Sequence, residues 1–110
     1  MVEKLATVLP VEDMQAAVAA WSALLGAQPT FVDGDRWAQF DVAGSRLALA
    51  GTDRTSNAAG VMVKVADLDG VHAKLTEAGF APGSVETGPH ERRFAVTMPG
   101  GWTATLYQPL

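Results

Sequence analysis

The chain has 110 residues, of which 48% are hydrophobic and 18% charged, and its formal net charge is −4 at pH 7. This length suits one domain with a single core, and no apolar run is long enough to span a bilayer. The negative charge makes nucleic acid a poor partner and favours a neutral or cationic small molecule over a polyanion.

The first half of the sequence predicts a strand, a helix and three further strands. The helix should begin after Asp13 and end before Gly26, because its apolar residues recur at helical spacing. These residues are Met14, Val18, Trp21 and Leu25. Alternation of apolar and polar residues places the strands at 5–11, 30–32, 36–42 and 46–50. Asp33-Gly34 is typical of a hairpin turn between the second and third strands.

A polar, turn-rich segment, residues 52–59, is expected to link this half to the next. The pattern then restarts. A second helix should follow Asp67 and direct Leu68, Val71 and Leu75 inward. Strands are expected at 60–65, 84–87, 92–98 and 102–108.

The two halves are therefore copies of one βαβββ module, which we place at residues 1–51 and 60–110 of a single domain spanning 1–110. Asp13 and Asp67 stand at the expected helix N-caps, where a carboxylate accepts hydrogen bonds from unpaired backbone N–H groups. Gly26 and Gly79 stand at the expected C-caps. The fold class predicted is α+β, with the two modules forming a concave mixed sheet and the helices on its outer face.

The concave side of the sheet is the default site for a ligand, because alternation gives it a mixture of aromatic, polar and apolar side chains. The predicted ligand-binding residues are Trp37, Gln39, Met62, Lys64, Arg93, Trp102, Thr105 and Tyr107. Trp37 is the expected stacking platform for a planar ligand, whereas Trp21 is expected to be core. His90 and Asp41 are weak candidates for acid–base catalysis, and no nucleophile or phosphate-binding motif is present.

The sequence resembles the vicinal oxygen chelate superfamily, which includes glyoxalase I, extradiol dioxygenases and bleomycin resistance proteins. The resemblance covers essentially the whole chain. It lies in Val11-Glu12-Asp13-Met14 with Leu24-Leu25-Gly26, Val65-Ala66-Asp67-Leu68 with Glu77-Ala78-Gly79, and the tail from Pro99 to Gln108.

In metal-using members of that superfamily, four strands supply His, Gln or Glu ligands. The corresponding positions of this chain are Ala6, Ala48, Gly60 and Thr105. None of these is an imidazole or a carboxylate, which are the ligands that divalent ions prefer, so we expect no metal and no other cofactor.

The resemblance implies a metal-free protein that binds an antibiotic or another aromatic natural product in a cleft and acts as a homodimer. A metal-independent lyase or isomerase acting on a small metabolite is the alternative. Cysteine is absent, which excludes disulfides and thiolate chemistry. Met1 is not followed by a basic and then apolar segment, so we expect a cytoplasmic protein.

Overall fold

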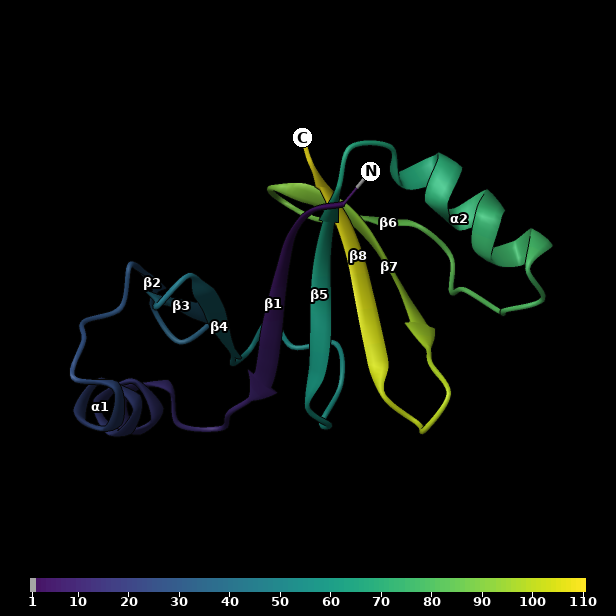
Figure 1. The fold of residues 1–110 in the computed structure, drawn as a ribbon. Helices are drawn as coiled ribbons and strands as arrows, with labels where there is room; N and C mark the ends of the chain where they lie inside the picture. The colour runs from purple at the N-terminus through teal and green to yellow at the C-terminus, as the bar shows by residue number, and fades with distance from the viewer. Residues whose placement is uncertain (1) are drawn as a thin grey trace. The chain divides into compact units, whose positions relative to one another are not determined.

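A computed structural model describes residues 2–110 and divides them into two compact units. The N-terminal unit is Ala6–Ala59, and the C-terminal unit combines residues 2–5 with Gly60–Leu110. Each unit contains one helix and a set of strands, and the order of elements repeats from one unit to the next (Figure 1). The α+β class and the two βαβββ modules are confirmed.

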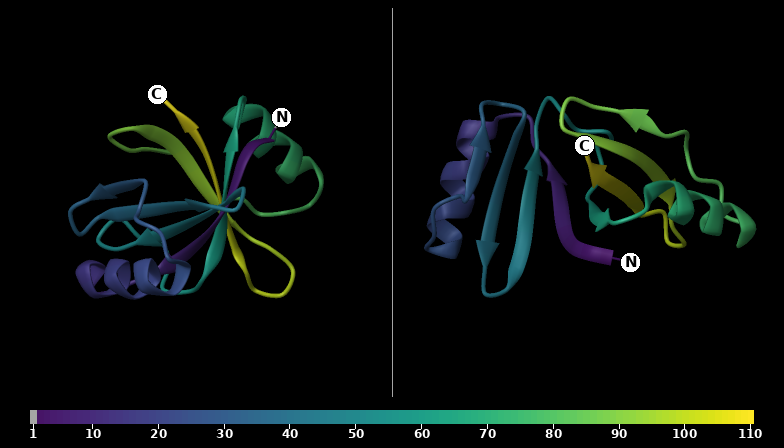
Figure 2. Two further views of the ribbon diagram at one scale, coloured as in Figure 1. Left: turned by 60° about the vertical axis from the view of Figure 1, so that its left-hand side comes forward. Right: turned by 90° about the horizontal axis from the view of Figure 1, so that it is seen from above.

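The N-terminal unit holds α1 and a sheet in which the strand order is β2-β3-β4-β1. β1 pairs with β4 in parallel, and the other neighbours are antiparallel. In both views of Figure 2, α1 runs alongside these strands. The elements are β1 (Val2–Pro10), α1 (Met14–Leu25), β2 (Phe31–Asp33), β3 (Trp37–Val42) and β4 (Ser45–Ala50).

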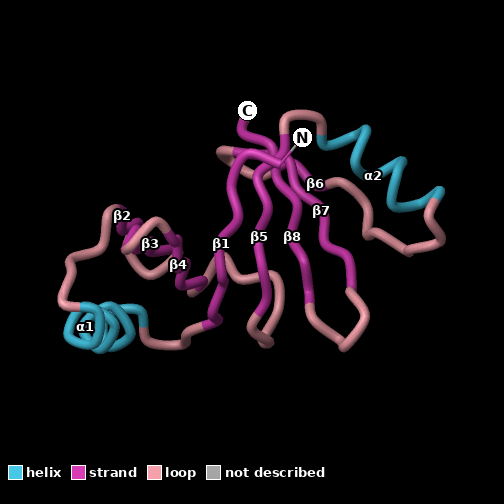
Figure 3. The backbone as a smooth tube through the Cα atoms, viewed as in Figure 1, coloured by secondary structure: helices cyan, strands magenta, loops and turns pink. Residues whose placement is uncertain are grey.

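The C-terminal unit holds α2 and a sheet in which the strand order is β5-β8-β7-β6. β5 pairs with β8 in parallel, so β8 lies between β5 and β7 although it is last in sequence. Figure 3 shows the same succession of strand, helix and three strands as in the first half. The elements are β5 (Gly60–Val65), α2 (Leu68–Glu77), β6 (Glu86–Thr87), β7 (Glu91–Thr97) and β8 (Thr103–Pro109).

Most predicted element boundaries agree with the structure to within two residues, and β1 is the main exception. It starts at Val2 rather than Leu5. Residues 2–5 belong to the C-terminal unit, and their side chains are exposed, so no burial pattern marks them as a strand. They belong to β1 only through backbone pairing, and the alternation of apolar and polar residues does not reveal that pairing.

Both helices begin at the predicted caps. The Asp13 carboxylate accepts from the Ala16 N–H at 3.0 Å, and the Asp67 carboxylate accepts from the Gly70 N–H at 3.1 Å. Gly26 ends α1 in the left-handed conformation, at φ +64°. At α2 the prediction is one residue off, because Ala78 is the C-cap and Gly79, at φ +92°, follows it.

Each unit has its own apolar core between the helix and one face of the sheet. In the N-terminal unit it contains Met14, Ala38, Phe40 and Leu49, and in the C-terminal unit Val65, Leu68, Phe94, Val96, Ala104 and Leu106. Trp21 packs against the first of these cores but is only partly buried. The predicted inward residues of α2, Leu68, Val71 and Leu75, all pack against the second.

Three polar contacts hold α2 in the C-terminal unit, two to the sheet and one to a loop, and the helical periodicity reveals none of them. Gln108 of β8 accepts from the Leu68 N–H at 3.0 Å, which satisfies a donor at the helix start. Arg92 of β7 donates to both carboxylate oxygens of Asp69, at 3.1 and 2.8 Å. The His72 ring lies 2.9 Å from the Gly83 carbonyl oxygen, which ties the helix to the loop that follows it.

Within residues 2–110, neither helix is long and apolar enough to cross a membrane.

The buried Gly51 permits a close backbone approach after β4. Its N–H donates to the Arg36 carbonyl oxygen at 3.0 Å, and a Cβ at this position would collide with the carbonyl oxygen of Asp35. We expect Gly51→Ala to lower the free energy of unfolding by about 1–3 kcal/mol, the usual cost of overpacking. Gly83→Ala is the milder control. Its Cβ would lie 3.3 Å from the Ala95 carbonyl oxygen, a tight contact that a small shift relieves. Equal losses for the two variants in urea denaturation would contradict this explanation.

The Asp69–Arg92 pair predicts a pH dependence of stability. Its hydrogen bonds from Arg92 lower the pKa of Asp69. A carboxylate with a depressed folded-state pKa stabilises the fold above its unfolded pKa, and this contribution disappears as the pH falls through the folded value. In urea denaturation at stepped pH, the free energy of unfolding of wild type should therefore exceed that of Asp69→Asn at neutral pH. The two values should converge in acid. Arg92→Gln should remove the same pH-dependent part of the free energy of unfolding. If wild type and Asp69→Asn still differ in acid, the Asp69–Arg92 pair is not the source of the difference.

Candidate functional site

Five of the predicted ligand-binding residues come together on one face of the C-terminal sheet. Lys64, Tyr107 and Arg93 are in register across β5, β8 and β7. Side chains in register share a face of the sheet. Met62, Thr105 and Ala95 are in register across the same three strands. We call this surface the polar face and define it as Met62, Thr105 and Ala95 together with Lys64, Tyr107 and Arg93.

The polar face lies opposite the side that α2 covers. The residues between its members, such as Val63, Phe94 and Leu106, belong to the core against α2. All six polar-face side chains are half-buried. They therefore form a continuous, partly shielded surface, which suits contact with a small molecule better than a fully solvated face does.

Each cation of the polar face has a carboxylate beside it. The Arg93 Nη1 atom lies 3.2 Å from the Glu91 Oε1 atom, and both side chains are mostly shielded from solvent. The Lys64 ammonium lies 3.9 Å from the Glu3 carboxylate, which is an ion pair but is beyond hydrogen-bond distance. The two positive charges are thus compensated within the unit.

The Lys64 ammonium and the Thr105 hydroxyl lie on adjacent strands of the polar face, and neither makes a hydrogen bond among residues 2–110. The buried Nε atom of Arg93, on the same face, has no acceptor there either. The Lys64 side chain is 29% exposed, so a ligand can reach its ammonium group. A half-buried donor without a partner is unfavourable unless a ligand or an ordered water accepts from it.

The N-terminal unit carries the other two predicted strand residues, Trp37 and Gln39. The Trp37 indole N–H donates to the Gln39 side-chain oxygen at 3.0 Å, which fixes the two side chains relative to each other. They are in register with Ala50 and Ala48 of β4, which are buried. Trp37 and Gln39 are both half-buried, and this aromatic surface with its orienting amide lies on the opposite side of β3 from the core residues Ala38 and Phe40.

Asp41, a weak catalytic candidate, is held in a polar network. Its carboxylate accepts from the Arg46 guanidinium at 2.8 Å and from the Thr30 hydroxyl at 2.6 Å. These bonds engage both oxygens of the carboxylate, which counts against a role as general base. His90, the other candidate, is exposed in the loop before β7, where its backbone carbonyl accepts from Leu110.

Trp102 lies apart from the polar face. It precedes β8 at the Gly100-Gly101 turn and is 60% exposed. A Cβ at Gly100 would lie 3.1 Å from its ring. By alternation Trp102 belongs with Ala104 rather than with Thr105.

Sequence reasoning missed Glu3 and Glu91, the two carboxylates beside the polar-face cations. Glu91 had a usable signal, because it stands two residues before Arg93 on one strand and so on the same face. Glu3 had none, since it reaches Lys64 only through the tertiary fold.

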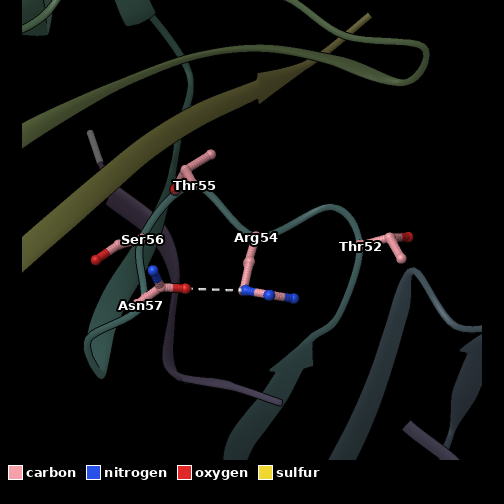
Figure 4. A pocket seen from close by; sticks show the side chains of 5 residues that line it. All are labelled: Thr52, Arg54, Thr55, Ser56 and Asn57. Carbon is pink, nitrogen blue, oxygen red and sulfur yellow. Dashed lines mark hydrogen bonds between the residues drawn. The ribbon is translucent and has the colours of Figure 1, made fainter. Parts of the chain in front are cut away.

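A polar hollow of about 460 Å³ lies in the segment after β4, lined by Thr52, Arg54, Thr55, Ser56 and Asn57. The Arg54 side chain donates to Asn57 at 3.1 Å and to the carbonyl oxygens of Gly51 and Val11. In Figure 4 the side chains of Thr52 and Thr55 point away from Arg54. The polar groups do not converge on one point, so this hollow is a weaker candidate than the polar face.

The residues at the expected metal positions do not fit a metal. Ala6 and Ala48 present only buried methyl groups. A side chain at Gly60 would collide with the Thr103 carbonyl oxygen, and Thr105 offers only a hydroxyl. In the part of the chain that the structure describes, no three His, Cys, Asp or Glu residues gather as a metal site. We therefore assign no chemistry to a metal here.

No protein-family model and no curated protein matches the sequence. Solved structures do match it. An NAD-dependent benzaldehyde dehydrogenase structure from Legionella pneumophila has a TM-score of 0.87 at 14% identity, over 96% of this chain and 99% of that one.

Two further structures show the same likeness. A glyoxalase/bleomycin resistance protein/dioxygenase superfamily member from Vibrio splendidus 12B01 has a TM-score of 0.74 at 14% identity, over 98% of this chain and 99% of that one. Methylmalonyl-CoA epimerase from Mycobacterium tuberculosis has a TM-score of 0.63 at 15% identity, over 99% and 87%. At such low identity these likenesses establish the fold and leave the function open. The chain has the fold of the glyoxalase/bleomycin resistance protein/dioxygenase superfamily, as the sequence resemblance implied.

Proposed function

We propose that this protein binds a small organic molecule on the polar face of its C-terminal unit and does so without a metal. The observation that carries the proposal is that Lys64 and Thr105, two donors on a half-buried face that α2 does not cover, make no hydrogen bond among residues 2–110. A ligand oxygen would satisfy both donors. Met62, beside Thr105, supplies a soft apolar contact for a ring.

Trp37 offers a separate aromatic surface, on the N-terminal unit. Its indole N–H is already bonded to Gln39, so the remaining contribution of this side chain is its ring surface. A ring held by a neighbouring amide is a rigid stacking platform with little conformational entropy to lose. An antibiotic or another planar natural product is the ligand class that we propose, and sequestration is the activity.

A metal-independent lyase or isomerase is the second candidate. The observation that favours it is the position of Tyr107, whose strand neighbours in register are the cationic Lys64 and Arg93. From this position the Tyr107 hydroxyl would exchange a proton with a substrate bound on the polar face. Analysis of the ligand after release separates the two functions, because a binding protein returns it unchanged.

We also propose a homodimer. β2 pairs with β3 alone within its unit, and Phe31 and Val32 of β2 are about half exposed. An apolar outer strand is a surface that a second copy would cover. Sedimentation at micromolar concentration should show a dimer, and a monomer throughout would contradict this.

Substitution of Lys64 tests the ligand site. With coumarin, a planar aromatic lactone, as the probe, we expect Lys64→Met to weaken binding about tenfold or more, since a hydrogen bond from a charged donor is lost. Dissociation constants would come from NMR titrations. The control is Lys74→Met, which removes an exposed lysine from α2. If Lys64→Met and Lys74→Met bind coumarin alike, the polar face is not the site.

A further inference from the structure

The charges around the polar face indicate which class of ligand it accepts. We infer that the face selects a neutral aromatic carbonyl compound and discriminates against the corresponding carboxylate, because its cations are already paired with Glu3 and Glu91. This inference rests on the proposed function and adds to it the charge and the chemical class of the ligand.

The Arg93–Glu91 pair is the stronger of the two compensating contacts. The residues lie two apart on β7, so their side chains share one side of the sheet. The Arg93 Nη1 and Glu91 Oε1 atoms are 3.2 Å apart, and the side chains are only 22% and 19% exposed. Solvent screens such a pair less than it screens a surface pair, so the guanidinium presents little net charge to a ligand.

The charge of Lys64 is compensated, although its ammonium makes no hydrogen bond among residues 2–110. Glu3 is close enough to offset the ammonium charge but too far to accept a hydrogen bond, at 3.9 Å. Lys64 can therefore donate to a ligand oxygen without offering a net positive charge. Thr105 adds a neutral donor on the neighbouring strand.

A third carboxylate lies on the same side of the sheet as Lys64 and Arg93. Glu86 of β6 is in register with Arg93, so it lies on the same side of the sheet. Two cations thus face three carboxylates: Glu3, Glu86 and Glu91. An incoming carboxylate would have to displace one of them or accept like-charge repulsion, whereas a carbonyl oxygen can accept from Lys64 and Thr105 with the ion pairs intact.

Two probes with the same ring system test the inference. Coumarin is neutral and carries a lactone carbonyl, and coumarin-3-carboxylate adds one negative charge. The chain contains a single tyrosine, Tyr107, so a ring-labelled tyrosine gives one NMR resonance from the centre of the polar face. We expect saturable shifts of this resonance with both probes and at least fivefold tighter binding of coumarin.

Removal of one compensating carboxylate should change the selectivity. Glu91→Gln should tighten coumarin-3-carboxylate binding about tenfold and change coumarin binding less than about twofold, because only the anion is sensitive to the lost charge. The matched control is Glu77→Gln, which makes the same change in net charge at an exposed position at the end of α2. Glu3→Gln, beside Lys64, should act like Glu91→Gln and serves as the second variant if Glu91→Gln fails to fold.

The outcomes separate the inference from the proposed function. If neither probe shifts the Tyr107 resonance, the polar face is not a ligand site and the proposed function fails. If both probes bind but the wild type prefers the carboxylate, the selectivity inference is wrong and the proposed function stands. The same holds if Glu91→Gln and Glu77→Gln change carboxylate binding equally, since the ion pair would then have no local effect.

Discussion

The alternation of side chains along β8 decides which of its residues enter the core of the C-terminal unit and which enter the polar face. Because β8 lies between β5 and β7, each of its side chains belongs to one of two surfaces. Ala104 and Leu106 enter the core against α2, and Thr105 and Tyr107 enter the polar face. A slip of one residue in the register would exchange the two sets, so the core and the candidate site depend on the same pairing.

Charge on the polar face is organised locally rather than through the net charge of the protein. Arg93 is neutralised from its own strand by Glu91, and Lys64 is neutralised by Glu3 from the start of the chain. A face that keeps its donors while cancelling its charge favours hydrogen-bond acceptors over anions. This agrees with the net charge of −4, which disfavours anionic partners at longer range.

The two modules share a backbone pattern but differ in what they offer to a ligand. On the N-terminal sheet, the face opposite α1 includes the buried side chains of Ala6, Ala48 and Ala50, and Trp37 and Gln39 supply its larger groups. The corresponding face of the C-terminal sheet carries long polar side chains. Neither face provides imidazole or carboxylate groups at Ala6, Ala48, Gly60 or Thr105, the positions at which the sequence resemblance implied metal ligands, and the close approach of Thr103 to Gly60 leaves no space for a side chain there.

Interactions between residues close together in the chain allowed the helices and strands to be predicted from the sequence. Helix periodicity, the Asp13 and Asp67 caps and strand alternation determine the βαβββ repeat, because each acts over a few residues. Arg92 and Arg93 are neighbours on β7 and therefore lie on opposite faces, where they pair with Asp69 and Glu91. The extension of β1 to Val2, the Gln108 contact at the start of α2 and the position of Glu3 beside Lys64 join residues far apart in the sequence. Only the tertiary structure decided these features, because pairing between distant segments is set by the packing of the whole sheet and leaves no local pattern.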